Sequence, residues 1–208
     1  QISAGDLHTC AIMRNGRAVC WGNTSLGRLG IGDINAGSSI PQRVVGPQLY
    51  DMISAGHSGT CAITRGGQAF CWGSNAFFAL GAGSSNASEN TPVRVLNLER
   101  LTQITTGRFH GCALREDGVA FCWGANNFGQ LGDGTTQNKA LATRVKRLFD
   151  IENIDASFRH TCAIRENGTP VCWGLNLFGE VGDGTTTRRL FRQRVKRLID
   201  ATDVATGR

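Results

Sequence analysis

Eight cysteines carry the clearest chemistry in this sequence. They form four pairs in which the second cysteine follows ten positions after the first: Cys10 and Cys20, Cys61 and Cys71, Cys112 and Cys122, Cys162 and Cys172. An even number at regular spacing favours disulfide bonds, whereas zinc knuckles use a closer, two-residue spacing. Reduced thiols packed in a core and metal ligands are the alternatives.

A run of basic side chains is the second feature that could do chemistry. It contains Arg188, Arg189, Arg192, Arg194, Lys196 and Arg197, and an earlier stretch repeats it with Arg144, Lys146 and Arg147. A patch of this kind attracts acidic proteins, acidic polysaccharides or nucleic acid. Alternating charges on an edge strand are also typical of a solvated face. We expect no aromatic stacking pattern on the surface beside them, which disfavours nucleic acid and leaves a protein or acidic polysaccharide as the partner.

Two Gly-Asp-Gly-Thr-Thr segments, at 132–136 and 182–186, could suggest a phosphate cradle or a calcium turn. A phosphate loop needs a following helix with a Lys-Ser/Thr pair, and calcium needs roughly six to eight converging oxygens, so turn chemistry is the better interpretation. No Gly-x-Ser-x-Gly elbow, His-Glu-x-x-His motif or paired acidic spacing is present. The sequence therefore predicts a protein that is not an enzyme and holds no cofactor or metal.

These residues recur because the chain repeats itself roughly every 50 residues. Each repeat opens on a similar segment, which begins at Ile2, Ile53, Ile104 and Ile154, and continues with the cysteine pair and Trp-Gly. All eight cysteines and four tryptophans belong to this pattern. We expect repeats at 2–52, 53–103, 104–153 and 154–203, with 204–208 matching the first strand of a further repeat.

Short alternating apolar runs flank a glycine-containing turn inside each cysteine pair, which is typical of a β-hairpin. If Cys10 faces Cys20, Gly16 falls at the turn position that favours a left-handed backbone. Opposed residues on such strands have Cβ atoms about 4.5–5.5 Å apart, close to what a disulfide requires. A repeat of roughly four short strands cannot bury both faces of its sheet alone, whereas sheets stacked around an axis can. The sequence predicts an all-β propeller of four-stranded blades.

The motifs of the third repeat resemble those of the regulator-of-chromosome-condensation repeat family. The match rests on His110, Gly118, Trp123-Gly124 and the segment from Asn126 to Gly134. The resemblance implies a seven-bladed ring, of which four repeats are present, and roles that run from nucleotide exchange on a small GTPase to inhibition of secreted β-lactamases. Cysteines stand where such proteins carry small or aliphatic residues, which indicates an oxidising compartment. We find no positions for the contacts of the exchange-factor role.

Three histidines occupy one equivalent repeat position: His8, His110 and His160. The second repeat has Gly59 there, while His57 lies two residues earlier. A metal ring would need these side chains to converge on one ion, but equivalent residues of a propeller lie on different blades. We therefore interpret them as structural histidines with satisfied hydrogen bonds.

The composition is typical of a globular protein, with 40% hydrophobic and 18% charged residues and a net charge of +6. No apolar run approaches the roughly 18 residues of a membrane span. We expect a secreted, periplasmic or cell-surface propeller that presents rim loops to a macromolecular partner. The alternatives are a spacer domain of a larger surface protein and an exchange-factor-like regulator of a small GTPase. With four repeats, the chain is a piece of a longer protein, or the strand at 204–208 closes a smaller ring, or chains assemble to complete one. We favour the piece, and self-association is the expectation if the four-repeat chain is complete.

Overall fold

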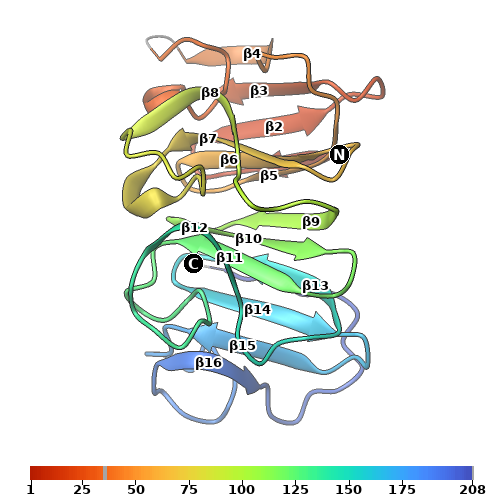
Figure 1. Ribbon diagram of the computed structural model, residues 1–208, viewed down its shortest axis with the longest axis vertical. Helices are drawn as coiled ribbons and strands as arrows, with labels where there is room; N and C mark the ends of the chain where they lie inside the picture. Colours follow the sequence, from red (N-terminus) through yellow and green to blue (C-terminus); the bar gives the residue numbers. More distant parts are fainter. Residues whose placement is uncertain (35–36, 208) are drawn as a thin grey trace.

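The computed structural model describes residues 1–34 and 37–207, and within these residues it contains four antiparallel sheets of four strands. Neighbouring strands in each sheet are also neighbours in the chain. The sheets follow one another along the long axis of the molecule (Figure 1). This arrangement confirms the prediction of a propeller built from four-stranded blades.

The first blade consists of β1 (Ile2–Ala4), β2 (His8–Ile12), β3 (Ala18–Gly22) and β4 (Ser38–Arg43). The second consists of β5 (Tyr50–Ala55), β6 (Gly59–Thr64), β7 (Ala69–Ser74) and β8 (Ser88–Arg94). The third consists of β9 (Leu101–Thr106), β10 (His110–Arg115), β11 (Ala120–Gly124) and β12 (Lys139–Arg144). The fourth consists of β13 (Ile151–Ala156), β14 (His160–Arg165), β15 (Pro170–Gly174) and β16 (Arg189–Arg194). Short 3-10 turns, η1 (Ser25–Gly27) and η2 (Ala76–Phe78), follow β3 and β7.

The central hairpin of each blade has the register that the cysteine spacing predicts. Cys10 pairs with Cys20 across β2 and β3, and the other three cysteine pairs face each other in the same way. Gly16 at the hairpin turn has a φ of 85°, a backbone conformation that side chains disfavour. The first strands of successive blades contact one another, so they surround the axis and the fourth strands form the outer perimeter.

The repeat boundaries expected from the sequence fall inside strands. β5 starts at Tyr50, β9 at Leu101 and β13 at Ile151, each ahead of the repeat start by a few residues. A register shift lies near the start of each of these strands, and all three residues are buried. Burial of these side chains explains why each strand begins earlier than the repeated segment at Ile53, Ile104 or Ile154 alone suggests.

Residues 204–207, expected to be the first strand of a further repeat, form no strand, because the described residues contain no strand beside them for pairing. They nevertheless occupy the equivalent position. The backbone N–H of Thr206 donates to Asp155 Oδ2 at 2.7 Å, and equivalent bonds join the first strands of the other blades. Arg208, the last residue of the expected strand, lies outside the described residues.

The hydrophobic core lies between adjacent blades. Trp173 of the fourth blade is fully buried in a cluster with Leu131 and Val145 of the third. Gly132 makes this packing feasible, because a Cβ there would lie 2.8 Å from the Trp173 indole nitrogen. Each large side chain of this kind contributes about 1.5–3 kcal/mol on burial, so the blades depend on one another for stability.

Candidate functional site

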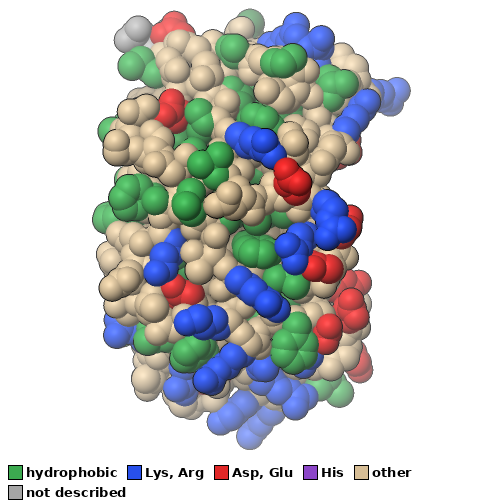
Figure 2. All heavy atoms as spheres, viewed as in Figure 1, with side chains coloured by type: hydrophobic (Ala, Val, Ile, Leu, Met, Phe, Trp, Pro, Cys, Tyr) green, Lys and Arg blue, Asp and Glu red, His purple; other side chains and the backbone are tan. Residues whose placement is uncertain are grey.

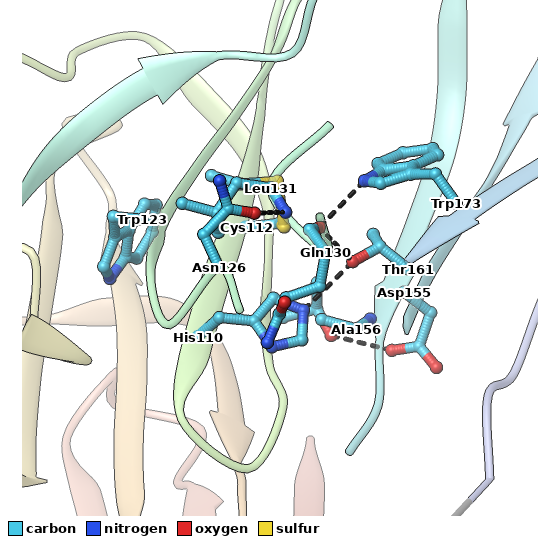
Figure 3. Close-up of a disulfide and its surroundings, with 12 residues drawn as sticks. His110, Cys112, Trp123, Asn126, Gln130, Leu131, Asp155, Ala156, Thr161 and Trp173 are labelled. Carbon is cyan, nitrogen blue, oxygen red and sulfur yellow. Dashed lines mark hydrogen bonds between the residues drawn. A yellow bond between two sulfur atoms is a disulfide. The ribbon is translucent and has the colours of Figure 1, made fainter. Parts of the chain in front are cut away.

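His8 and His110 belong to buried joints between blades, one of which is drawn in Figure 3, whereas His160 contacts Ser157 of its own blade. The Trp173 indole N–H donates to the Gln130 carbonyl oxygen at 2.8 Å, and the Thr161 hydroxyl donates to the same oxygen at 2.9 Å. His110 Nε2 lies 3.0 Å from Thr161 Oγ1 and is the donor, because the hydroxyl proton is directed to Gln130. Nδ1 of His110 is buried without a partner. Burial, with a smaller effect of His160, lowers the pKa of His110 to about 3.

The joint between the first two blades repeats this arrangement. His8 Nε2 lies 2.7 Å from Thr60 Oγ1, and both Thr60 and Trp72 donate to the carbonyl oxygen of Arg28 at 3.0 Å. Burial, followed by the positive charge of Arg28, lowers the pKa of His8 to about 4. The imidazole is therefore neutral at physiological pH. The expectation of satisfied hydrogen bonds is wrong for His8 and His110, because Nδ1 of each ring is buried without a partner among the described residues.

The joint between the second and third blades lacks both the histidine and the threonine of the other two joints. Gly59 replaces the histidine and Gly111 replaces the threonine, while Trp123 still donates to the Ala79 carbonyl oxygen at 2.9 Å. The sequence reasoning missed this coupling. Its signal was present in the sequence: His8 and His110 are each matched by a threonine in the next repeat, Thr60 and Thr161. Gly59 is matched by Gly111. In the described residues, no group of three or more His, Cys, Asp or Glu could hold a metal ion.

The cysteine pairs form four disulfides in the structure, with sulfur–sulfur distances between 2.08 and 2.13 Å. All eight cysteines are at most 5% exposed. Three pairs lie in core clusters between blades, and Cys162 and Cys172 lie in a cluster with Val181 of their own blade. A redox-active thiol needs access to its substrate and a stabilised thiolate. This burial indicates that the disulfides brace the hairpins.

The Gly-Asp-Gly segments are turns held by their own aspartates. Asp183 accepts a hydrogen bond from the Thr185 backbone N–H at 2.9 Å and forms an ion pair with Arg189 at 2.6 Å. Asp133 has the same contact with Thr135 and lies 3.4 Å from Lys139. Burial raises the pKa of the Asp133 carboxyl, but the hydrogen bonds and the lysine together hold it below its ordinary value. Both carboxylates are thus occupied in stabilising their loops.

The basic run on the outer strands gathers on one side of the molecule. We call this surface the basic perimeter; it comprises Arg144, Lys146, Arg147, Arg188, Arg192, Arg194, Lys196 and Arg197. Figure 2 shows its blue side chains over β12 and β16, in the lower half of the view. The two blades interlock here, since Arg192 Nε donates to the Arg147 carbonyl oxygen at 2.8 Å. The guanidinium of Arg147 in turn lies 4.6 Å from the centre of the Phe191 ring.

The six basic residues singled out in the fourth repeat have different roles in the structure. Arg189 neutralises Asp183 and is therefore not free to bind a partner. Arg188 donates to a backbone carbonyl, that of Asn127, and keeps its charge. Arg194, Lys196 and Arg197 are exposed, and the described part of the chain offers them no carboxylate within ion-pair distance.

The expectation that no exposed aromatic pattern exists is wrong. Phe77 is 45% and Phe178 is 91% exposed, and Phe109, Phe128 and Phe158 are partly exposed. Phe77, Phe128 and Phe178 share one repeat position, whereas Phe109 and Phe158 occupy two others, so only the folded loops show which rings lie close together. Several of them pack against arginines, a point developed below.

Comparison with known proteins gives this architecture a family. The family model described as "Regulator of chromosome condensation (RCC1) repeat" matches residues 1–28, 53–78, 101–130 and 151–180, and a second model of that description matches 66–114 and 117–164. The chain belongs to the RCC1-repeat family. The RCC1 match falls on the segments that begin each blade, which confirms the resemblance found in the sequence.

Curated relatives contain similar RCC1 repeats within longer chains. The human "Probable E3 ubiquitin-protein ligase HERC6" is 37% identical over 136 residues, which cover 62% of this chain and 13% of that protein. The Arabidopsis thaliana "RCC1 domain-containing protein RUG3, mitochondrial" is 34% identical over 157 residues, covering 72% of this chain and 35% of the relative. The chain therefore spans only a minor part of either protein.

Solved structures resemble the fold more completely. Human WBSCR16 has a TM-score of 0.90 at 22% identity, covering 100% of this chain and 55% of that structure. Yeast RCC1 (Prp20), bound to Kap60, has a TM-score of 0.85 at 20% identity, covering 95% and 48%. The ectodomain of the Physcomitrella patens receptor kinase CR4 has a TM-score of 0.57 at 28% identity, covering 88% and 44%. The first two similarities establish the fold alone.

Proposed function

We propose that this chain is a non-enzymatic binding module whose basic perimeter contacts an acidic protein or acidic polysaccharide. The observation that carries the proposal is the exposed charge of Arg194, Lys196 and Arg197, which have no carboxylate within ion-pair distance among the described residues. The third blade adds the exposed side chains of Arg144 and Lys146. Complementary charge steers such a partner and sets the orientation of the complex. The interlock of β12 and β16 holds this surface on two rigid blades.

We propose an extracytoplasmic location, meaning secreted, periplasmic or at the cell surface. Four buried disulfides support it, because such bonds persist in oxidising compartments. Similarity to a receptor-kinase ectodomain adds support. No helix within the described residues has both the length and the apolar character needed to cross a membrane.

Two other functions compete with this proposal. A spacer domain does not require basic residues to gather on one side of the propeller, so the basic perimeter disfavours that role. An exchange-factor-like role is favoured by the similarity to yeast RCC1, whose binding to Gsp1p and histones is described for that protein. That role in a reducing compartment would require the eight cysteines to be free thiols, which the buried pairs disfavour.

We further propose that the four blades form part of a seven-bladed ring. Ile2, at the exposed side of the first blade, is 67% exposed, whereas the equivalent Ile53 is 1% exposed because the first blade covers it. Trp21 is likewise partly exposed while the other three tryptophans are fully buried. A neighbouring blade would cover both residues.

Retention on immobilised heparin and on immobilised poly-glutamate, eluted with a salt gradient, tests the proposed contact. Variant R194E/K196E/R197E carries the reversal on the perimeter, and R14E/R17E/R43E carries the same charge change on the first blade. We expect the perimeter variant to elute at much lower salt than the control variant. If both variants elute at equally lowered salt concentrations, net charge alone governs retention, and the proposed contact is wrong.

A further inference from the structure

Two arginines and three phenylalanines form one continuous stack on the rim of the third and fourth blades. The Arg108 guanidinium lies 4.7 Å from the centre of the Phe109 ring and 4.2 Å from that of Phe158. The Arg159 guanidinium lies 4.9 Å from Phe158 and 4.8 Å from Phe128. We call these five residues the arginine–phenylalanine stack. Phe77 of the second blade extends it, with its ring centre 5.3 Å from that of Phe109.

Phe128 lies in the segment between β11 and β12, whereas the other four members of the stack lie in loops fixed around the propeller axis. Each joins the first and second strands of a blade, and backbone bonds connect them: His57 N–H donates to the Gly107 carbonyl, and Arg108 N–H donates to the Ser157 carbonyl at 3.1 Å. Gly107 allows this contact, because a Cβ there would lie 2.0 Å from the Ser157 oxygen. The loops surround a hollow of about 250 Å³, lined by Arg108 and Phe158 among others. The stack therefore borders a concave surface on a rigid frame.

Both guanidinium groups of the stack keep an uncompensated charge. The described residues place no carboxylate within ion-pair distance of Arg108 or Arg159, and Nε of Arg108 is buried without a hydrogen-bond partner. Aromatic contacts orient each guanidinium and reduce the entropy lost on binding. Donor edges held in this way suit a carboxylate, which accepts two parallel hydrogen bonds from arginine.

We propose that the arginine–phenylalanine stack binds an acidic segment of a partner protein, with aspartate or glutamate carboxylates on Arg108 and Arg159. Guanidinium groups already lie against three of the rings, which leaves those rings poorly placed to stack on nucleic-acid bases. The hollow also holds the carboxylate of Asp6, paired with His57, which opposes a continuous phosphate backbone. A peptide can instead place single carboxylates on the two arginines, and Arg159 is not among the residues that line the hollow.

This site goes beyond the basic perimeter and adjoins it. Arg188 of the perimeter donates to the carbonyl oxygen of Asn127, the residue before Phe128 of the stack. A partner bound at the rim could thus extend onto β16, but the inference does not depend on that contact, since it rests on Arg108 and Arg159 alone.

Fluorescence anisotropy of the intact chain with a labelled poly-glutamate peptide tests the inference. Variant R108Q/R159Q removes both charges of the stack, and the matched variant R194Q/R197Q removes two charges of the perimeter. We expect R108Q/R159Q to raise the Kd for poly-glutamate by about tenfold or more, the loss expected of one charge-assisted hydrogen bond. The conservative R108K/R159K should also bind weakly, because lysine lacks the planar pair of donors.

The outcomes separate this inference from the proposed function. A loss confined to R194Q/R197Q, or equal losses in both double variants, would overturn the role of the stack while leaving the perimeter in place. A loss confined to the stack variants would support the inference even if the perimeter failed its own test. Single-stranded oligothymidylate is the second probe: tighter binding than poly-glutamate, lost in R108Q/R159Q, would overturn the protein partner. Wild-type affinity in R108K/R159K would overturn the bidentate geometry.

Discussion

Lowering the pH from 8 to 5 should destabilise the fold through its two neutral, buried histidines. The ordinary pKa of histidine is 6.5, and in the folded chain the pKa of His8 is about 4 and that of His110 about 3. At a pH between the folded and the unfolded pKa, the histidine is protonated in the unfolded chain but neutral in the folded one. The free energy of unfolding is therefore highest above pH 6.5 and falls as the pH drops below that value.

The magnitude follows from the distance between the pH and the unfolded pKa. At pH 5 each histidine favours the unfolded state by about 2 kcal/mol, because one pKa unit corresponds to about 1.4 kcal/mol. His8 and His110 together therefore remove about 4 kcal/mol, a large part of the about 5–15 kcal/mol typical of a domain. The carboxylates that stabilise loops stay ionised over this range, since the pKa values of Asp133 and Asp183 lie below the ordinary value.

Urea unfolding at pH 8 and pH 5, with disulfides intact, measures this loss. The variant His110→Gln keeps an N–H donor for Thr161 but cannot titrate, so we expect its loss between the two pH values to be smaller by about 2 kcal/mol than that of the wild type. His57 and His160 titrate in both proteins and cancel in the comparison. An identical pH dependence in the variant would refute the assignment of a proton-excluding joint to His110.

Three further perturbations test the packing. Trp173→Ala should lower the free energy of unfolding by about 3–5 kcal/mol, and Trp21→Ala by clearly less, because Trp21 has no blade covering it; similar losses would contradict the inter-blade core. Gly132→Ala should cost about 2–4 kcal/mol by urea unfolding, since its φ of 66° disfavours a side chain and its Cβ would meet Trp173; a neutral effect would exclude that contact. Removing one bridge in C112A/C122A should cost about 2–3 kcal/mol in calorimetry under oxidising conditions, and an unchanged transition would mean that this pair is not bonded.

The features that recur with the repeat could be predicted from the sequence. Opposed cysteines and a turn glycine at Gly16 fix the hairpin register, because alternation and turn chemistry act within a few residues. Stacked blades then follow from the apolar faces that a single small sheet leaves exposed. Strand starts such as Tyr50 were less predictable, since they depend on register shifts and on burial against the next blade.

The features that join different repeats could not be predicted in this way. Thr161 acquires its role only when His110 of the preceding blade faces it, and Gly111 is explained only beside Gly59. The arginine–phenylalanine stack is hidden further, because the order Arg108-Phe109 in one loop becomes Phe158-Arg159 in the next. Arg108 and Phe158 share one repeat position, and Phe109 and Arg159 share the next, but the residue types are exchanged, so their contact depends on the folded loops.

The sequence also could not show which basic side chains form ion pairs within the fold. Arg189 belongs to the basic run in the chain, yet the loop that precedes β16 brings it to Asp183. Arg194, at the other end of β16, has no such partner among the described residues. Only the placement of the acidic loop residue distinguishes a structural arginine from one that can bind.

Hydrogen–deuterium exchange of the intact chain, with and without poly-glutamate, tests the central claim most directly: that this propeller binds acidic partners through defined surfaces. We predict slower exchange in peptides covering 144–147 and 188–197, with the loops at 107–109 and 157–159 protected if the stack also binds. Unchanged exchange at 188–197, or protection spread evenly over all four blades including the hairpin at 13–17, would contradict the account.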